Sequence, residues 1–299
     1  MDTIDDRRAV IQPLSKFWYQ NKVAAMDMLR LDLLHPVVSG NKWYKLRLNV
    51  DFAKEKGFTT ILTFGGGFSN HLVATAYTAK LFGLKAIGIV RGKYAQLTPT
   101  LLDCQAYGME LIFVTKEDYK NKEEPEWQET LVNNFDQTYI IPEGGANQKG
   151  IEGAGLIRWK ISNTYSHIIT AVGSGTTMIG LRNKLPEIQT VFGFAPFKEG
   201  VYLKETISRQ LDPGKNQNWD LFDQWHFGGF GKWDNTLLRF MNEFYDMNKI
   251  PLDIVYTSKM MFGMQEMLLD NFFTVGDKIL CIHSGGVQGN VSVRDKLIF

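Results

Sequence analysis

Short apolar segments alternate with helix-length segments through most of the chain, and this order constrains the fold more than any other feature. The first such unit is an apolar run at 60–64, a glycine-rich turn, and a helical pattern at 70–82 that Gly83 ends. Parallel strands need a crossover of about a dozen residues, usually a helix, whereas antiparallel strands can be joined by a short turn. The sequence therefore predicts an α/β fold with parallel sheets.

Further units of this kind are expected along the rest of the chain. Strand patterns lie at 86–91, 110–115, 138–142, 167–172, 190–195 and 278–283, and helical patterns at 98–107, 124–135, 149–163, 176–185, 200–211, 235–247 and 259–269. Before the first unit, an extended segment at 22–34 leads to a turn and to a helix at about 42–56. Residues 212–233 are predicted to be the least regular region, and their three tryptophans either pack in the core or cap a pocket.

The charge balance is even, with 33 basic and 32 acidic residues among 299. Proteins that bind nucleic acid or a membrane surface usually carry a basic patch, so neither partner is expected. No stretch reaches the roughly 18 uninterrupted apolar residues that a membrane span needs. The acidic and then basic start lacks the apolar segment of a secretory signal. A cytoplasmic location is therefore expected.

The cysteines and histidines do not suggest a metal site. Cys104 and Cys281 lie far apart, and the five histidines show no ligand spacing such as His-x-x-His. The two cysteines are interpreted as buried apolar side chains, with reactive thiols as the alternative. His283, at the end of a predicted strand, either lies beside a pocket or is a satisfied histidine at the edge of a sheet.

The loop Gly173-Ser174-Gly175-Thr176-Thr177 follows one predicted strand and begins the next helix. In this setting backbone N–H groups and the helix dipole can hold a phosphate. The glycines allow close approach of the backbone, and the hydroxyls can add donors. Position 178 is methionine rather than the third glycine of a dinucleotide fingerprint, so one monophosphate fits better than a pyrophosphate. The alternative is a strand-to-helix turn without a ligand.

The turn Gly65-Gly66-Gly67-Phe68-Ser69-Asn70-His71 also joins a strand to a helix. Ser69 or Asn70 at the start of a helix is common for local reasons, because both residues cap helices well. A run of three glycines before them is more than a cap requires. Backbone donors here suit a substrate carboxylate, and Ser69 is a candidate nucleophile or acid–base group. A serine hydrolase is weakly supported, because no partner residues can be assigned to Ser69.

Lys42 lies in the stretch Ser39-Gly40-Asn41-Lys42-Trp43, at the start of a predicted helix. A lysine is usually solvated, but the glycine, asparagine and tryptophan around this one form an unusually specific frame. Burial lowers the pKa of a lysine amine and makes it a nucleophile. Lys45, one turn later, is expected to be an ordinary lysine on the face of the helix.

These stretches resemble the 1-aminocyclopropane-1-carboxylate (ACC) deaminase / D-cysteine desulfhydrase family of pyridoxal phosphate (PLP) enzymes, over nearly the whole chain. The resemblance is carried by 39–42, 65–71, 173–177, 255–259 and 283–286. It implies an α/β, two-lobed, three-layer parallel-sheet enzyme of PLP fold type II, the tryptophan synthase β-like fold. It also implies PLP as cofactor, a small amino acid as substrate, and a homodimer.

The resemblance assigns roles to individual residues. The catalytic residues are Lys42, Ser69 and Tyr256. Lys42 is the lysine that binds the cofactor covalently and moves protons, Ser69 contacts the substrate and would attack the ring of the cyclopropane substrate, and Tyr256 lies near the substrate. The cofactor-binding residues are Lys42, Asn70, Gly173, Ser174, Gly175, Thr176, Thr177 and Ser284, with Asn70 at the pyridoxal 3′-oxygen and Ser284 near the pyridine nitrogen. The substrate-binding residues are Ser69, Asn70, His71, Tyr256 and Thr257.

Two positions distinguish substrates within the family. Members that act on the cyclopropane substrate have a glutamate after the tyrosine and a leucine at the position of Ser284. This chain has Thr257 and Ser284, which is more similar to the D-cysteine desulfhydrase pattern. A neutral hydroxyl at the pyridine nitrogen holds less positive charge on the ring than a carboxylate and favours β-elimination of a good leaving group. Tyr44 replaces the arginine of many relatives.

The expected activity is deamination of D-cysteine to pyruvate, sulfide and ammonia, with ACC, giving 2-oxobutanoate and ammonia, as the alternative substrate. A non-catalytic protein that binds a phosphorylated small molecule is the alternative of another class. The expected domains are a large PLP-binding domain over 1–45 and 149–299, and a small inserted domain over 46–148.

Overall fold

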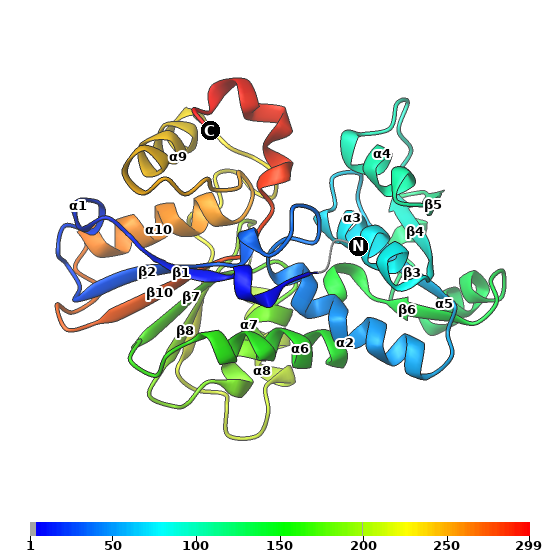
Figure 1. Ribbon diagram of the computed structural model, residues 1–299, viewed down its shortest axis with the longest axis horizontal. Helices are drawn as coiled ribbons and strands as arrows, with labels where there is room; N and C mark the ends of the chain where they lie inside the picture. Colours follow the sequence, from blue (N-terminus) through cyan, green and yellow to red (C-terminus); the bar gives the residue numbers. More distant parts are fainter. Residues whose placement is uncertain (1–3, 199) are drawn as a thin grey trace. The chain divides into compact units, whose positions relative to one another are not determined.

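The computed structural model describes residues 4–198 and 200–299, and the chain forms two compact units (Figure 1). The terminal unit consists of the chain up to Asn41 together with Ala154–Phe299, and the inserted unit is Lys42–Gly153. Each unit contains a largely parallel sheet with helical crossovers. The predicted α/β fold with parallel sheets is therefore confirmed.

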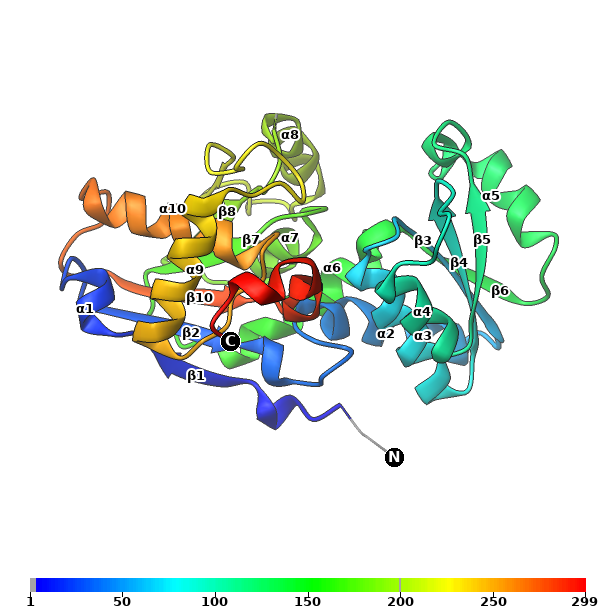
Figure 2. The same cartoon turned by 90° about the horizontal axis from the view of Figure 1, so that it is seen from above.

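The inserted unit contains a four-stranded parallel sheet in the order β5-β4-β3-β6. Its strands are β3 (Thr60–Gly65), β4 (Lys85–Arg91), β5 (Met109–Val114) and β6 (Thr138–Ile141), and its helices include α2 (Asn41–Glu55), α3 (Asn70–Phe82), α4 (Pro99–Ala106) and α5 (Pro125–Val132). Helices α3 and α4 lie on one face of the sheet and α5 on the other (Figure 2). All six residues of β3 are buried, as expected for a central strand covered on both faces.

The terminal unit contains a six-stranded sheet in the order β1-β2-β10-β7-β8-β9, parallel except for β1. Its strands are β1 (Val10–Pro13), β2 (Ala25–Arg30), β7 (His167–Ala171), β8 (Thr190–Phe194), β9 (Trp219–Phe222) and β10 (Lys278–His283). Its helices are α1 (Lys16–Tyr19), α7 (Thr176–Lys184), α8 (Val201–Gln210), α9 (Asn235–Asn248) and α10 (Thr257–Leu269), and α6 (Gln148–Gly155) precedes β7. Helices α9 and α10 cover one face, and α7 and α8 the other (Figure 1).

Each sheet has one point where the direction of strand addition reverses. In the inserted unit the chain adds β4 and β5 on one side of β3 and then places β6 on the other side. In the terminal unit it adds β8 and β9 on one side of β7 and later places β10 on the other side. Ligands of open α/β sheets bind at the carboxyl ends of the strands beside such a switch point.

Most of the expected elements are present, and the exceptions have local causes. Helix α3 spans the predicted residues and ends at Gly83, whose φ of +72° suits the left-handed cap. The single helix expected at 149–163 is wrong, because α6 ends at Gly155 and a 3₁₀ segment follows at Leu156–Lys160. Three glycines in α6 lower its helical propensity. Strand β9 lies inside the region expected to be least regular.

The tryptophans of that region contribute to packing. The Trp225 ring lies against Phe194 and Phe222 with centroids 5.5 and 6.2 Å away, and Trp233 packs against the core of the terminal unit. Trp219 belongs to β9. Of the two readings left open by the sequence, packing is the one that these contacts support.

Both cysteines are buried, as interpreted from the sequence. Cys281 belongs to the main core of the terminal unit. Burial raises the pKa of the Cys104 thiol to about 12 and also raises that of Cys281. A thiol that stays protonated near neutral pH is a poor nucleophile, so these residues are apolar core side chains.

Candidate functional site

The terminal unit presents the loop 172–177 and the turn 284–286 at its switch point, directly after β7 and β10. Gly175 has a φ of +81° and precedes the first residue of α7. No side chain caps this helix by a hydrogen bond in the described part of the chain. The first backbone N–H groups of a helix have no partners within the helix, so an uncapped first turn suits an anion.

Hydroxyl groups surround this uncapped helix end. Ser174 Oγ lies 2.8 Å from Thr176 Oγ1, and Asn41 Nδ2 donates to Thr177 Oγ1 at 2.9 Å. Thr176 and Thr177 are buried. A Cβ atom added to Gly173 would lie 3.4 Å from the Tyr256 hydroxyl oxygen, so the phenol lies beside the loop. The structure thus brings the predicted phosphate loop and Tyr256 together.

The turn Ser39-Gly40 packs against the turn Ser284-Gly285 at the same edge. Gly40 has a φ of +67°, and a Cβ atom there would lie 1.8 Å from the carbonyl oxygen of Ser284. The backbone N–H of Asn41 donates to the same carbonyl at 3.3 Å. Asn41 is therefore bound to both site loops of the terminal unit, and Lys42 is the next residue in the chain. Only glycine permits this approach at position 40.

His283 connects the Ser284 turn to the segment that carries Tyr256. Its Nε2–H donates to the Pro251 carbonyl at 2.7 Å, and its Nδ1 accepts from the Gly285 N–H at 3.2 Å. A carbonyl can only accept, so these two bonds assign the proton to Nε2. His283 is therefore a satisfied buried histidine, but β10 lies between β2 and β7 and not at an edge of the sheet as expected.

Asp253 orders the backbone around Tyr256. Its carboxylate accepts hydrogen bonds from the N–H groups of Val255, Tyr256 and Thr257 at 2.7–3.0 Å. The Thr257 hydroxyl donates to Asp253 Oδ1 at 2.7 Å and is fully buried. The Thr257 hydroxyl is thus bound within the protein, and contact between Thr257 and the substrate stays a prediction.

In the inserted unit, the glycine loop after β3 forms hydrogen bonds with the start of α3 and with Tyr94 and Thr98. Ser69 Oγ accepts from the Leu72 N–H at 3.3 Å and so caps α3, at which Asn70 is the first residue. The Gly67 N–H donates to the Tyr94 hydroxyl at 2.8 Å, and the Thr98 hydroxyl donates to the Gly67 carbonyl. Sequence reasoning missed Tyr94 and Thr98, because no local pattern marks a residue that supports a loop 27 to 31 positions away.

His71 is buried behind this loop in a defined tautomer. Thr63 Oγ1 donates to the Ile141 carbonyl at 2.7 Å, so it accepts the proton of His71 Nε2 at 2.9 Å. His71 Nδ1 is buried and has no hydrogen-bond partner among the described residues. Burial, reinforced by the charges of Lys45 and Lys42, lowers the His71 pKa to about 3. The ring is therefore neutral at physiological pH.

Lys42 and Lys45 occupy the first turn of α2. Lys42 is half-buried, whereas Lys45 is buried and donates to the Gly144 carbonyl at 3.1 Å. Burial, and secondly the charge of Lys42, holds the pKa of Lys45 well below its usual range. The expectation that Lys45 is an ordinary surface lysine is wrong. The cause is the loop after β6, which covers this face of the helix.

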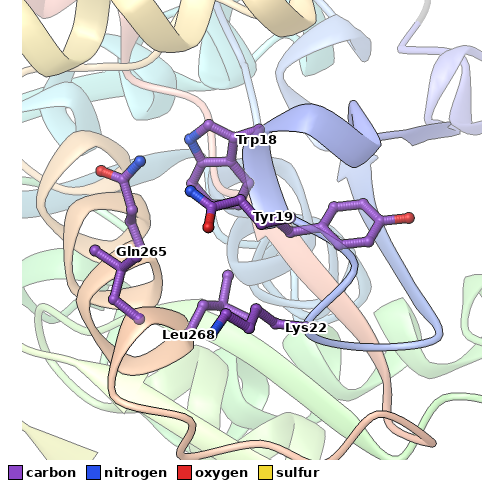
Figure 3. A pocket seen from close by; sticks show the side chains of 7 residues that line it. Trp18, Tyr19, Lys22, Gln265 and Leu268 are labelled. Carbon is purple, nitrogen blue, oxygen red and sulfur yellow. The ribbon is translucent and has the colours of Figure 1, made fainter.

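A small cavity of the terminal unit lies away from the switch point of its sheet. It is lined by α1, α10 and adjoining residues, of which Trp18, Tyr19, Lys22, Gln265 and Leu268 are labelled in Figure 3. These residues precede the starts of β2 and β10, so the cavity lies toward the amino ends of the strands. Its volume of about 10 Å³ has room for roughly one water molecule. It does not suit a cofactor.

In residues 4–198 and 200–299, none of the helices has the length and apolar character needed to span a membrane. Within the same residues, no cluster of three or more His, Cys, Asp or Glu side chains is arranged to hold a metal ion.

Comparison with known proteins identifies the family that this geometry suggests. Residues 22–285 match the family model of pyridoxal-phosphate dependent enzymes. The chain belongs to this family. PLP is accordingly the cofactor of the family, and both switch points fall within the matched residues.

Within this family, the chain is similar to proteins named for ACC deaminase and D-cysteine desulfhydrase. A Thermotoga maritima protein, whose name gives ACC deaminase as a provisional activity, is 31% identical over 90% of this chain and 91% of its own. The bifunctional D-cysteine desulfhydrase/ACC deaminase, mitochondrial, of Arabidopsis thaliana is 28% identical over 87% of this chain and 72% of its own. The crystal structure of an ACC deaminase homologue matches with a TM-score of 0.84 and 28% identity, covering 100% of this chain and 95% of the other. The resemblance found in the sequence is thereby confirmed.

Proposed function

We propose that this protein is a PLP-dependent lyase that removes both the β-substituent and the amino group of a small amino acid, with D-cysteine as the favoured substrate. D-cysteine and one water molecule give pyruvate, hydrogen sulfide and ammonia. The observation that carries the proposal is the position of Asn41, which binds the glycine loop through Thr177 and the Ser284 carbonyl directly before Lys42.

The residues present fit the cofactor. The uncapped end of α7, with the loop 173–177, would hold the phosphate through backbone N–H groups and hydroxyls. Lys42 would bind the cofactor covalently, Asn70 would bond the 3′-oxygen, and Ser284 would lie near the pyridine nitrogen. When bound, PLP supplies an electron sink for negative charge that develops at the substrate Cα.

Proton transfer would fall to Lys42 and Tyr256. The Lys42 amine takes the Cα proton of the substrate, for which it must be uncharged. Lys45, in the same turn of α2, has a pKa held low by burial and secondly by the charge of Lys42. The Tyr256 hydroxyl can return a proton to the departing group. Ser69, Asn70 and His71 would bind the substrate at the start of α3.

The substrate assignment depends on the residues near the pyridine nitrogen and at the start of α10. Ser284 provides a neutral hydroxyl where a leucine is typical of ACC-specific relatives, and Thr257 replaces their glutamate. Position 257 therefore carries no carboxylate, and its hydroxyl is bound to Asp253. These features favour elimination of a good leaving group such as a thiolate. ACC, giving 2-oxobutanoate and ammonia, is the second candidate.

Three further features belong to the proposal. The terminal unit is proposed to be the PLP-binding domain and the inserted unit the smaller one. The protein is proposed to act as a homodimer in the cytoplasm, as expected for a small-molecule enzyme of this family. Light scattering of the purified protein tests the dimer.

The test begins with the absorbance spectrum of the purified protein, followed by borohydride reduction and peptide mapping. The expected result is a violet-absorbing band and a reduced pyridoxyl adduct on Lys42. D-cysteine, L-cysteine and ACC are then compared as substrates, with sulfide, pyruvate and 2-oxobutanoate as the measured products. An adduct on another lysine, or turnover of ACC but not of D-cysteine, contradicts the respective part of the proposal.

A further inference from the structure

Lys259 is a buried lysine that contacts the backbone of two loops beside Tyr256. It is the third residue of α10, and its side chain is 2% exposed. Its Nζ donates to the carbonyls of His226 and Gly229, both at 2.8 Å, and to that of Pro196 at 3.3 Å. These carbonyls lie in the segments that follow β8 and β9, at the carboxyl edge of the terminal sheet.

The number of donors on Lys259 matches the number of acceptors around it. A protonated lysine has three N–H groups and no lone pair, so each of the three carbonyls can receive one proton. Burial lowers the pKa of Lys259 to about 8, against the opposing charge of Asp253. Such burial is costly for a cation, and the three bonds offset part of that cost.

The loop 226–231 contains one residue in a sparsely populated backbone conformation. Phe227 has a φ of +52°, which is uncommon for a residue other than glycine, whereas Gly228, Gly229 and Gly231 adopt their positive φ values freely. Such a conformation persists where its surroundings determine it, and the Lys259 bonds to the carbonyls of His226 and Gly229 hold the backbone on both sides of Phe227. The loop presents Phe230, whose ring is 59% exposed and lies 5.8 Å from the Tyr256 ring in an edge-to-face arrangement.

We infer that Lys259 is a positioning residue for the proposed reaction: by binding the carbonyls of His226 and Gly229, it holds Phe230 against Tyr256. Tyr256 is thereby kept beside Gly173, where its phenol can act on the substrate. The inference rests on the proposed function, in which Tyr256 moves a proton. Lys259 itself contacts carbonyls of the protein, so its effect on the reaction passes through the loop.

The test compares three variants of the holoenzyme. Lys259→Met removes the charge and the donors but keeps the side-chain length, and Lys259→Arg keeps the charge and donors. Lys22→Met is the matched control, because Lys22 donates to Asn271 just beyond the other end of α10. Hydrogen–deuterium exchange of the 226–231 amides reports on the loop, and kcat and KM for D-cysteine report on the reaction.

Lys259→Met is expected to speed exchange at 226–231 about fivefold or more and to lower kcat about tenfold, with a smaller change in KM. Lys259→Arg should restore part of both, and Lys22→Met should match the wild type. Wild-type exchange or wild-type kcat in a folded Lys259→Met protein overturns the inference. If the Lys259→Met protein does not fold, Phe230→Leu takes its place, because this exposed substitution removes the ring contact with Tyr256. An unchanged kcat in Phe230→Leu also overturns the inference.

Failure of the proposed function has a different signature. A wild-type protein that takes up no PLP and turns over neither substrate contradicts the proposed function. The exchange measurement still shows in that case whether Lys259 holds the loop.

Discussion

The glycine loops at 66–70 and 173–177 share one local design and differ in what satisfies the helix that follows. Each loop comes after a central parallel strand, at the switch point of its sheet. The Ser69 side chain caps α3 through the Leu72 N–H, whereas no side chain caps α7 in the described part of the chain. An uncapped helix end keeps its donors for an anion, which supports the phosphate role proposed for 173–177.

The charges around the two loops differ as well. Neutral hydroxyls surround 173–177, whereas Lys42, Lys45 and His71 lie in the first turns of the two helices beside the loop of the inserted unit. Burial keeps His71 neutral and holds the pKa of Lys45 low. The loop at 173–177 is therefore proposed to bind a phosphate, whereas the loop of the inserted unit lies beside the groups proposed to bind the substrate and to move its protons. The side chains around each loop account for the difference.

Lys42→Ala tests the catalytic role proposed for the lysine beside the loop of the inserted unit, and it should have the largest effect of the variants. Without the amine, kcat for D-cysteine should fall by roughly a thousandfold or more, because both the covalent bond to PLP and the proton acceptor are lost. Lys54→Ala, at an exposed position of the same helix, is the control and should keep wild-type activity. Steady-state sulfide release measures both. Substantial turnover by Lys42→Ala would assign the chemistry to another residue.

Gly40→Ala tests the turn of the terminal unit. Its Cβ would overlap the Ser284 carbonyl, so the free energy of unfolding should fall by about 3 kcal/mol or more. Gly57→Ala is a matched control, since Gly57 also has a positive φ of +75° but nothing within 4 Å of the added atom. That variant should lose only about 1–2 kcal/mol, the cost of placing alanine in the left-handed conformation. Urea unfolding of the two proteins measures the difference, and equal losses would show that the overlap is relieved cheaply.

The pH dependence of stability tests the burial of His71. Its pKa is about 3 in the folded protein, whereas an unfolded histidine titrates near 6.5. Between these values the unfolded chain binds the extra proton, so stability falls as the pH drops below about 6.5, by up to about 1.4 kcal/mol per unit from this group. Urea unfolding at about pH 7 and about pH 5 should show a smaller loss in His71→Gln than in the wild type. An equal loss contradicts a neutral, buried His71.

Thr63→Val tests the hydrogen bonds that hold His71 in the inserted unit. It leaves His71 Nε2 and the Ile141 carbonyl without their partner, which should cost about 1–3 kcal/mol. Thr78→Val is the control, because the equally buried Thr78 hydroxyl bonds only the Ala74 carbonyl of its own helix. Thermal unfolding compares the two. A smaller loss in Thr63→Val than in Thr78→Val would mean that the histidine is held by other contacts.

Local sequence patterns predict the fold class and the positions of the loops. Alternating apolar runs and helices predicted parallel sheets, and the glycine turns fell where the strands end, because these features depend on residues close together in the chain. The bounds of α3 followed from a cap at one end and Gly83 at the other. The family resemblance was carried by the same local stretches.

Which side chains are buried, and what they bind, depends on contacts between segments that are distant in the chain. The burial of Lys45 does not follow from the sequence, because Gly144, whose carbonyl it binds, lies 99 residues later in the chain. The support of Gly67 by Tyr94 and Thr98, and the three carbonyls around Lys259, likewise come from distant segments. A sequence pattern records the local geometry of the backbone, but burial and its effect on a pKa arise from neighbours that the fold alone brings into contact.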